Sequence, residues 1–492
     1  MITKALLEVS IEGLGKYEKT SIFPCGIFQY KKGINDKPGT PNYDLKRLAL
    51  KSSSMRLYPN VANCDWTNQV NWFKKDRADK QAYIDTLPEN EREKLISLLE
   101  KYPEYKDIFD LDAELHVTYN ERPTELFSTM GCRTINGADV NFMEEYKRNI
   151  KAFIEERFDD INTTFLSAAQ KDGRGNICPA TIILPTVAMM AKESVKKDVN
   201  IIEEFFKILT KKIEETKDAL IERFRWIASQ PAKSATFMYE NDTMEGYHPE
   251  EGIISALKHG TLTIGQIGIS ETLYILIGED QCSEEGMELA KRIEQLYLDK
   301  CNEYKAKYSL NFGVYYTPAE SLCYTAMKKF RTKYGEIENV TYYIDENGEK
   351  KYKEYFTNSI HVPVYKKISP FEKIDIESEL LPFSTAGAIC YIEITHDIVN
   401  NIDALEEILD YAMQHDIPYQ AFNVPSDQCR KCHYQGYIPI GSHCPHCGAP
   451  SDNIDRLRRV TGYLTGNYTT AFNEGKQDEV KDRVIHKKEY DF

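Results

Sequence analysis

The sequence predicts an α/β protein built around parallel strands, followed by a small metal-binding module near its C-terminus. Residues 176–190 form a short, nearly continuous apolar run, which is typical of a strand buried on both faces. Over 191–230 the apolar residues recur with a 3.6-residue period, and this period predicts a long amphipathic helix. Strand-like and helical stretches alternate along most of the chain, which favours parallel strands joined by helices.

The other expected elements follow in chain order. Residues 74–112 are dominated by charges, and we expect an exposed helical insertion there with a single apolar stripe. The remaining predicted strands are 19–35, 260–276 (whose end runs into a helix), 309–316, 340–344, 355–364 and 388–395. The remaining predicted helices are 44–57, 285–307, one that opens at Pro318, and 402–415.

The bulk composition narrows the classes of function. With 492 residues, the chain is long enough for two or more domains, or for one large barrel with attachments. A net charge of −15 disfavours nucleic acid as the main partner, although a local basic cluster can still bind anionic small molecules. We find neither a signal peptide nor an apolar stretch of the roughly 20 residues that span a membrane. The 12 cysteines therefore predict metal ligands and reactive thiols in a cytoplasmic protein rather than disulfides.

Two CxxC pairs near the C-terminus are the clearest signal for a metal. Cys429 and Cys432 form the first pair, Cys444 and Cys447 form the second, and eleven residues separate the pairs. Two such turns facing each other supply four thiolates in the tetrahedral arrangement that suits zinc. Because four protein ligands leave no open position, we expect a structural site. A redox function of one pair and four unrelated buried cysteines are the weaker interpretations.

Gly462 lies among β-forming residues, fifteen residues after Cys447. Glycine weakens a strand and often marks the close approach of another group. One interpretation is a turn that needs a positive φ angle. The other is chemical, because loss of a Cα hydrogen from glycine leaves a radical that is delocalised over the flanking amides. Such a radical survives only where oxygen and water are excluded and a thiol can exchange hydrogen with it.

Blocks of sequence along the whole chain favour the chemical interpretation. RRVTGYLTG (458–466), followed by AFNEGKQDEVKDRVIH (471–486), resembles the C-terminus of the anaerobic, class III ribonucleoside-triphosphate reductases, which are glycyl radical enzymes. Further blocks resemble the same family in the same order, namely KTSIFPCGIFQYKKGIN (19–35), NYDLKRLALKSSSMRLYPNVAN (42–63), STMGCRT (128–134), GTLTIGQIGISETL (260–273), YYTPAESLCY (315–324), YFTNSIHV (355–362), KISPFEKI (367–374) and the cysteine quartet.

This resemblance implies a fold, a division of the chain and a radical mechanism. The fold is the ten-stranded α/β barrel of glycyl radical enzymes, present in part over 1–425, with a zinc ribbon over 426–450 and a glycyl radical domain over 451–492. An activating enzyme with an iron–sulfur cluster and S-adenosylmethionine would remove a hydrogen from Gly462. Cys132 would then relay the radical as a thiyl and attack the ribose of a ribonucleoside triphosphate. The product would supply deoxyribonucleotides for DNA replication, and ATP binding belongs to the same family pattern.

A substrate site is expected at TPAES (317–321), which predicts the start of a helix. Pro318 suits the first helical position, with Thr317 as N-cap and Glu320 as its capping-box partner. Exposed N–H groups at such an end can hold phosphate, although an ordinary capped helix is nearly as good an interpretation. By resemblance the triphosphate would be held by Thr317, Pro318, Ala319, Glu320 and Ser321, and Asn358, Ser359 and His361 are candidates to line the cavity.

The chain also departs from the family pattern. Family members carry a long N-terminal part, with a second active-site cysteine, ahead of the block that begins near Lys19 here. We therefore expect the C-terminal part of a split or truncated enzyme, completed by a companion polypeptide and dimeric in the full assembly. Ile183 replaces an expected asparagine, and formate as reductant is in doubt because isoleucine offers no hydrogen bond. The alternatives are an inactive assembly or regulatory subunit and a glycyl radical lyase, with a zinc-ribbon nucleic-acid binder more distant.

Overall fold

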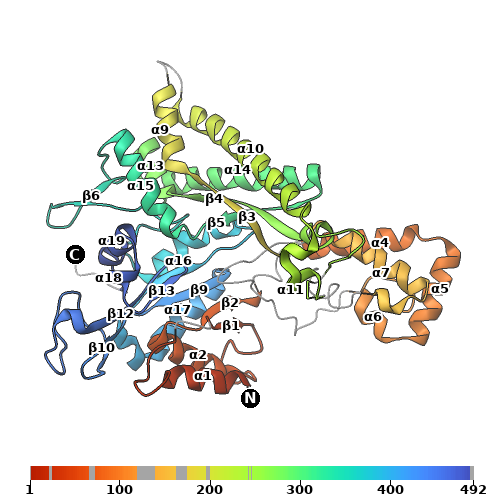
Figure 1. The fold of residues 1–492 in the computed structure, drawn as a ribbon, viewed down its shortest axis with the longest axis horizontal. Coiled ribbons are helices and arrows are strands. Elements are labelled where there is room, and N and C mark those ends of the chain that lie inside the picture. Colours follow the sequence, from red (N-terminus) through yellow and green to blue (C-terminus); the bar gives the residue numbers. More distant parts are fainter. Residues whose placement is uncertain are drawn as a thin grey trace.

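The computed structural model describes residues 2–21, 25–65, 72–118, 139–161, 174–195, 200–241, 243–244 and 246–487. Two β-sheets with their covering helices form the body of the molecule, and a helical unit and a small C-terminal sheet extend from it (Figure 1). Within these residues, we find no helix with the length and apolar character needed to cross a membrane.

The first sheet has the strand order β1-β2-β9-β8. β1 (Ile27–Tyr30) and β2 (Asn60–Asn63) are parallel, β2 and β9 (Tyr419–Asn423) are antiparallel, and β9 and β8 (Cys390–Glu393) are parallel. The helices associated with this sheet are α2 (Tyr43–Arg56), α16 (Pro370–Ser378) and α17 (Ile402–Gln414).

The second sheet consists of β3 (Arg174–Ile183), β4 (Gly260–Ile267) and β5 (Asn311–Tyr316), all parallel. Every residue of the central strand β4 is buried, which fits a parallel strand covered on both faces. In Figure 1 the long helices α10 (Ile201–Ala228) and α14 (Glu284–Tyr308) lie along one side of this sheet. The other helices of this part are α9 (Leu184–Ser194), α13 (Ile269–Ile277) and α15 (Glu320–Tyr334).

The two sheets meet at β5. The backbone N–H groups of Thr385 and Ala386 donate to the carbonyl of Val314, at 3.1 and 3.0 Å, and Tyr316 N–H donates to the carbonyl of Gly387 at 3.2 Å. The segment 385–387 leads directly into β8, so it joins the edge of the second sheet to the edge of the first. These three bonds hold the edge of the second sheet against the segment that leads into the first sheet.

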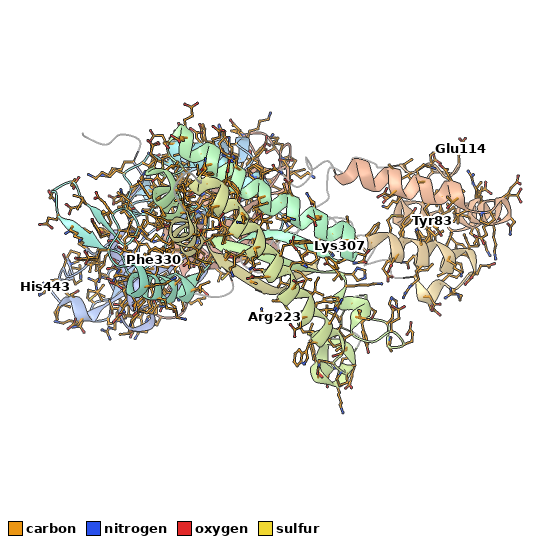
Figure 2. The ribbon with its side chains drawn as sticks, turned by 90° about the horizontal axis from the view of Figure 1, so that it is seen from above. Tyr83, Glu114, Arg223, Lys307, Phe330 and His443 are labelled. Carbon is orange, nitrogen blue, oxygen red and sulfur yellow. The ribbon has the colours of Figure 1, made fainter. Side chains whose placement is uncertain are left out.

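A helical unit with its own apolar core projects from this body. Figures 1 and 2 show it, marked by Tyr83 and Glu114, at the opposite end of the molecule from His443. Its core includes Leu95 and Leu99, which we predicted as an apolar stripe, and the buried Lys80–Asp110 ion pair. Its helices are α4 (Trp72–Thr86), α5 (Glu89–Lys101), α6 (Glu104–Phe109) and α7 (Phe142–Ile154), so the unit extends beyond the predicted insertion at 74–112.

The C-terminal region forms a third sheet, in the order β11-β10-β12-β13. Its strands are β10 (Ser426–Cys429), β11 (Gln435–Gly436), β12 (Ile454–Val460) and β13 (Tyr463–Thr465), and two short helices follow, α18 (Tyr468–Ala471) and α19 (Glu474–Asp482). Because β10 pairs with β12, one sheet spans both sides of the predicted boundary at 450, and the domain division itself stays a prediction. The other elements are α1 (Ile2–Glu12), α11 (Thr236–Tyr239), α12 (Ile254–Leu257), β6 (Tyr342–Ile344) and β7 (Lys350–Tyr352).

Three sequence predictions of secondary structure were wrong. The apolar run 176–190 is strand only as far as Ile183 and continues as α9, because Pro185 suits the first turn of a helix. The helix expected over 191–230 is therefore two helices. The strand expected over 355–364 is irregular backbone, and its conformation includes Ser359 at a positive φ of 48°.

Candidate active site and metal centre

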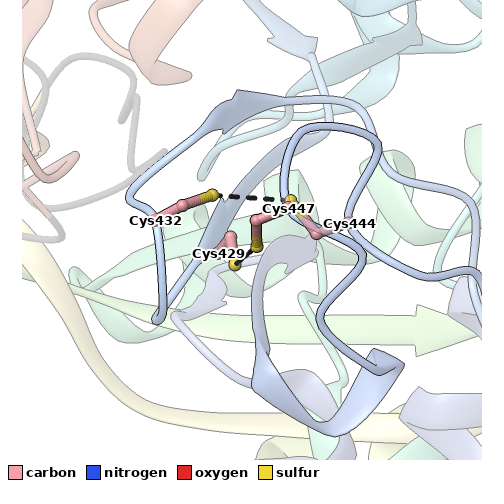
Figure 3. A group of neighbouring side chains, drawn as sticks. All are labelled: Cys429, Cys432, Cys444 and Cys447. Carbon is pink, nitrogen blue, oxygen red and sulfur yellow. Dashed lines mark hydrogen bonds between the residues drawn. The ribbon is translucent and has the colours of Figure 1, made fainter.

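The four cysteines of the CxxC pairs come together at one point (Figure 3). Their sulfur atoms all lie within 4.8 Å of one another. The Sγ atoms of Cys429 and Cys447 are 3.7 Å apart, and those of Cys432 and Cys444 are 3.6 Å apart. Four sulfurs bound to one zinc ion at about 2.3 Å stand about 3.8 Å from one another, along the edges of a tetrahedron. The cluster therefore has the donor set and the dimensions of a structural zinc site.

The cysteine cluster anchors the strand that leads to Gly462. Cys429 ends β10 and pairs with Ile454, the first residue of β12. Further along β12, Arg458 donates two hydrogen bonds to the Asp427 carboxylate, at 2.5 and 3.2 Å. Such a forked pair is geometrically specific, and the Arg458 side chain is almost buried. The cysteine loops and this pair thus fix the position of β12.

Gly462 lies in a two-residue turn between β12 and β13, where Val460 pairs with Tyr463. The other turn residue, Thr461, has a φ of 53° and a relative exposure of only 3%. A β-branched residue in the left-handed region is a genuine outlier, and conformations of this kind cost about 1–3 kcal/mol each. They persist where the surroundings impose them, and they cluster at functional sites. The turn is therefore both a constrained backbone site and a candidate site of chemistry.

A small cavity of ≈ 30 Å³ lies beside this turn, and Thr461 lines it together with Asn358 and His361. His361 and Lys373 both contact the carboxylate of Glu377, at 3.1 and 2.6 Å. Burial acts to raise the pKa of Glu377, but these two neighbours lower it below its ordinary value. The Gly462 turn, through Thr461, and the segment around Asn358 therefore border one small pocket, whose lining includes the charged residues Lys373, Glu479 and Arg483.

The carboxyl ends of β3, β4 and β5 form a second feature of the site. The hydroxyl oxygens of Thr181, on β3, and Thr317, just after β5, are 3.0 Å apart. They meet across Gly265 of β4, where a Cβ atom would lie 1.9 Å from the Thr317 hydroxyl. Only glycine leaves room for this contact. Ligands of parallel α/β sheets bind at this end of the strands.

The start of α15 differs from the sequence prediction. The N-cap is Ala319, whose carbonyl accepts from Cys323 N–H at 3.1 Å, so Thr317 and Pro318 lie ahead of the helix. The predicted capping box of Thr317 and Glu320 is wrong, because Thr317 is engaged with Thr181 instead. The N–H of Ala319 donates to Oδ1 of Asn358 at 2.8 Å. Asn358 therefore holds the backbone of Ala319, the residue at which α15 begins.

The C-terminal helix α19 brings a cation to the same place. Lys476, with a relative exposure of 4%, donates through Nζ to the Ser321 hydroxyl at 3.4 Å. The preceding Gly475 permits this approach, since a Cβ there would lie 2.7 Å from the Cβ of Tyr324. The segment that follows Gly462 in the chain thus packs against the first turn of α15.

Of the two remaining candidate positions, Cys132 and Ile183, the structure describes only Ile183. Cys132 falls outside the described residues, so its proposed approach to Gly462 stays a prediction. Ile183 ends β3, where it is paired with Ile267 and packs against the apolar core. No hydrogen-bonding side chain occupies that position.

Sequence reasoning did not find Thr181, Gly265 or Lys476. For Gly265 a signal existed, because a glycine within a strand often marks a close backbone approach. Thr181 and Thr317 are 136 residues apart, and Lys476 and Ser321 are 155 residues apart. No local pattern reports contacts across such separations.

Comparisons with known proteins fit this fold and arrangement. A solved structure named anaerobic ribonucleotide reductase aligns with 99% of this chain and 58% of its own length, at a TM-score of 0.58 and 19% identity. The Thermotoga maritima anaerobic ribonucleotide reductase with glycerol in its active site aligns with 97% of the chain, at a TM-score of 0.56 and 17% identity. The fold is thus α/β and corresponds to part of the barrel of the anaerobic ribonucleotide reductases, since 58% of each of these structures is covered.

Sequence comparison makes the assignment more specific. Residues 1–486 match the family of anaerobic ribonucleoside-triphosphate reductases, and the chain belongs to this family. The Haemophilus influenzae and Escherichia coli anaerobic ribonucleoside-triphosphate reductases are each 29% identical to it, over 503 and 504 residues. Each alignment covers 99% of this chain but 56% of the relative, so the chain spans about half the length of these relatives.

Proposed function

We propose that this chain is the radical-bearing part of an enzyme that reduces ribonucleoside triphosphates to 2′-deoxyribonucleoside triphosphates without oxygen. The observation that carries the proposal is the Gly462 turn, which is strained at Thr461 and shares a cavity with Asn358 next to the strand ends. Membership of the family supports the same reaction.

In the proposed mechanism, an activating enzyme with an iron–sulfur cluster and S-adenosylmethionine removes one hydrogen atom from the Cα of Gly462. Cys132 then gives its thiol hydrogen to Gly462 and becomes a thiyl radical. The thiyl removes the 3′ hydrogen atom of the ribose, and the 2′ hydroxyl leaves as water. An external reductant supplies two electrons and two protons, of which one proton goes to the leaving water and the other to C2′. Cys132 finally returns its hydrogen to C3′.

The substrate triphosphate is proposed to bind at the start of α15. Thr317, Pro318, Ala319, Glu320 and Ser321 form this turn at the carboxyl ends of three parallel strands, where helix N–H groups favour an anion. The buried Lys476 adds a positive charge next to Ser321. A structure of the Thermotoga maritima anaerobic ribonucleotide reductase contains dATP and CTP, and its fold is similar to that of this chain, with a TM-score of 0.54.

We also propose zinc as the resident metal of the cysteine cluster. Cys429, Cys432, Cys444 and Cys447 supply four sulfur donors, and the chemistry that zinc provides here is structural. The ion would hold the two cysteine loops together and, through β10, keep β12 in place.

Completion of the enzyme is a further part of the proposal. A companion polypeptide would supply the barrel portion that relatives carry beyond the aligned half, and the full assembly would be a homodimer. A thiol reductant is favoured over formate because Ile183 offers no hydrogen bond. The proposed location is the cytoplasm, and membership of the family supports it.

Electron paramagnetic resonance tests the radical site. We expect a doublet signal after anaerobic incubation of the chain, its companion and a radical S-adenosylmethionine activating enzyme. Gly462→Ala should abolish this doublet, because alanine lacks the second Cα hydrogen. Cys132→Ser should keep the doublet but lose nucleotide reduction by several orders of magnitude.

Gly466→Ala is the matched control, since a Cβ at Gly466 meets no atom within 4 Å. It should retain the doublet and the fold. A doublet that persists in Gly462→Ala would exclude Gly462 as the radical site.

A further inference from the structure

The segment 355–359, which contains Asn358, is held between the starts of two helices. On one side, Gly268 N–H donates to the carbonyl of Thr357 at 3.0 Å, and Ile269 N–H donates to that of Ser359 at 3.4 Å. On the other side, Oδ1 of Asn358 accepts from the Ala319 N–H at 2.8 Å. The segment therefore links the first turn of α13 to the turn that precedes α15.

Glu271, in the first turn of α13, anchors this segment. Its Oε1 accepts three hydrogen bonds, from Thr357 N–H at 2.9 Å, from the Thr357 hydroxyl at 2.8 Å and from Lys353 Nζ at 2.5 Å. The side chains of Glu271 and Lys353 both have an exposure of 0%. A fully buried ion pair is costly to desolvate and is a weak source of stability by itself. The presence of this ion pair in the core therefore calls for a structural reason other than stability.

The hydrogen bonds supply that reason. Glu271 fixes Thr357, the next residue in the chain is Asn358, and Asn358 fixes the N–H of Ala319. Because segment 355–359 is irregular backbone, no helix or strand ladder holds it in place, and side-chain bonds of this kind act together with its backbone bonds to Gly268, Ile269 and Cys323. Charge-assisted hydrogen bonds are about twice as strong as neutral ones, so a carboxylate is well suited to this task.

We propose that Glu271, paired with Lys353, is a positioning residue that sets the phosphate-binding turn Thr317–Ser321 through Thr357 and Asn358. The inference rests on the proposed nucleotide site, because it assigns to that turn the role of holding the triphosphate. Glu271 itself does not contact the nucleotide. Asn358, which the sequence suggested as a direct substrate ligand, acts in the same way through Ala319.

Amide hydrogen exchange of the full chain, read on peptides covering 315–323, tests this role. Glu271→Gln keeps the shape of the side chain but loses its charge, so we expect exchange in 315–323 to accelerate at least about tenfold, as for the loss of one hydrogen bond to a charged group. ATP and CTP should slow exchange of the same peptides in the wild type. In Glu271→Gln, at least about tenfold more nucleotide should be needed for equal protection.

Two further variants separate positioning from general stability. Asp110→Asn breaks the buried Lys80–Asp110 pair of the helical unit, where Lys80 also has an exposure of 0%. It should accelerate exchange within 72–118 and leave both the exchange and the nucleotide requirement of 315–323 unchanged.

The double variant Glu271→Met with Lys353→Met removes both buried charges and keeps their volume, so it should stay folded. Exchange in 315–323 should still be fast, because Thr357 has lost its acceptor.

The outcomes are distinct. If 315–323 exchanges at the wild-type rate in both Glu271→Gln and the double variant, the positioning role is excluded. If only Glu271→Gln is affected, the unpaired charge of Lys353 is the cause and the role is again excluded. If Glu271 controls exchange but neither nucleotide protects 315–323 in the wild type, the proposed nucleotide site fails while the link between Glu271 and the turn stands.

Discussion

Several ionisable side chains are buried in the apolar core, where burial disfavours their charged form. Glu294, on α14, is an example, since its carboxyl lies 2.7 Å from the side-chain amide of Gln266 near the end of β4. Burial raises the pKa of Glu294 to about 8, against the smaller opposing effect of its hydrogen bond to Gln266. At neutral pH this carboxyl is therefore largely protonated in the folded protein. Two other groups are also held at a cost in free energy. Thr461 has a strained backbone conformation, and Glu271 and Lys353 are desolvated as a buried ion pair.

The raised pKa of Glu294 predicts a pH dependence of stability. Above its ordinary pKa the unfolded chain releases the proton that the folded state retains, so the free energy of unfolding falls as pH rises from about 5 to about 8. Above the folded pKa the loss is complete and the contribution becomes constant. Glu294→Gln removes this term, and its stability relative to the wild type should increase by up to about 4 kcal/mol between about pH 5 and about pH 8.

Urea denaturation of both proteins across this pH range measures the difference. Glu222→Gln, on the exposed side of α10, is the control and should track the wild type at every pH. Parallel curves for Glu294→Gln and the wild type would show that Glu294 has no raised pKa in the folded protein.

Among the elements, the cysteine loops and the hairpin β12–β13 act as one unit. β10 and β12 share a ladder, so the position of the Gly462 turn depends on loops that lie ahead of it in the chain. Without a metal, the four thiols do not hold the two cysteine loops together, because the free energy of metal binding contributes directly to folding.

Loss of the metal should therefore loosen the hairpin before it affects the barrel. In Cys432→Ser we expect loss of bound zinc, measured by elemental analysis, and faster hydrogen exchange over 454–465. Cys282→Ser is the control, because Cys282 lies outside the cluster, and it should keep one zinc per chain. Unchanged exchange over 454–465 in a zinc-free protein would contradict a role of the ribbon in holding the turn.

For the molecule as a whole, the exposed apolar surface of α1 is the clearest indication of a partner. Ile2, Leu6 and Val9 are 78%, 64% and 51% exposed and recur at helical spacing, so they form one stripe. Contiguous exposed apolar surface marks sites of interaction. We expect the companion polypeptide that we propose above to cover this stripe.

Leu6→Glu should weaken binding of that companion at least tenfold, because burial of one leucine contributes about 1.5–3 kcal/mol and a buried glutamate adds a further cost. Titration of labelled chain with the companion measures the change. Phe237→Glu, at a residue 72% exposed on α11, is the matched control and should bind normally. A chain that reduces nucleotides with no partner would contradict the need for a companion.

Much of the architecture could be predicted from local patterns. Apolar periodicity predicted the α/β alternation and most of the helices, and it failed where two elements share one apolar run, as at Ile183. The capping box at Thr317 was wrong because a tertiary contact with Thr181 outweighed the local preference. The segment 355–364 has the composition of a strand, but its hydrogen bonds go to side chains and helix starts.

The sequence by itself determined the alternation of strands and helices and the two CxxC pairs, because each depends on spacing within a few residues. Gly462 was singled out as a candidate radical site only by the blocks of family resemblance along the whole chain. The tertiary structure alone decided which polar groups meet at the strand ends. The contacts of Thr181 with Thr317, Asn358 with Ala319 and Lys476 with Ser321 join residues that are 136, 39 and 155 positions apart. Their formation depends on how the whole barrel packs, which no local pattern encodes.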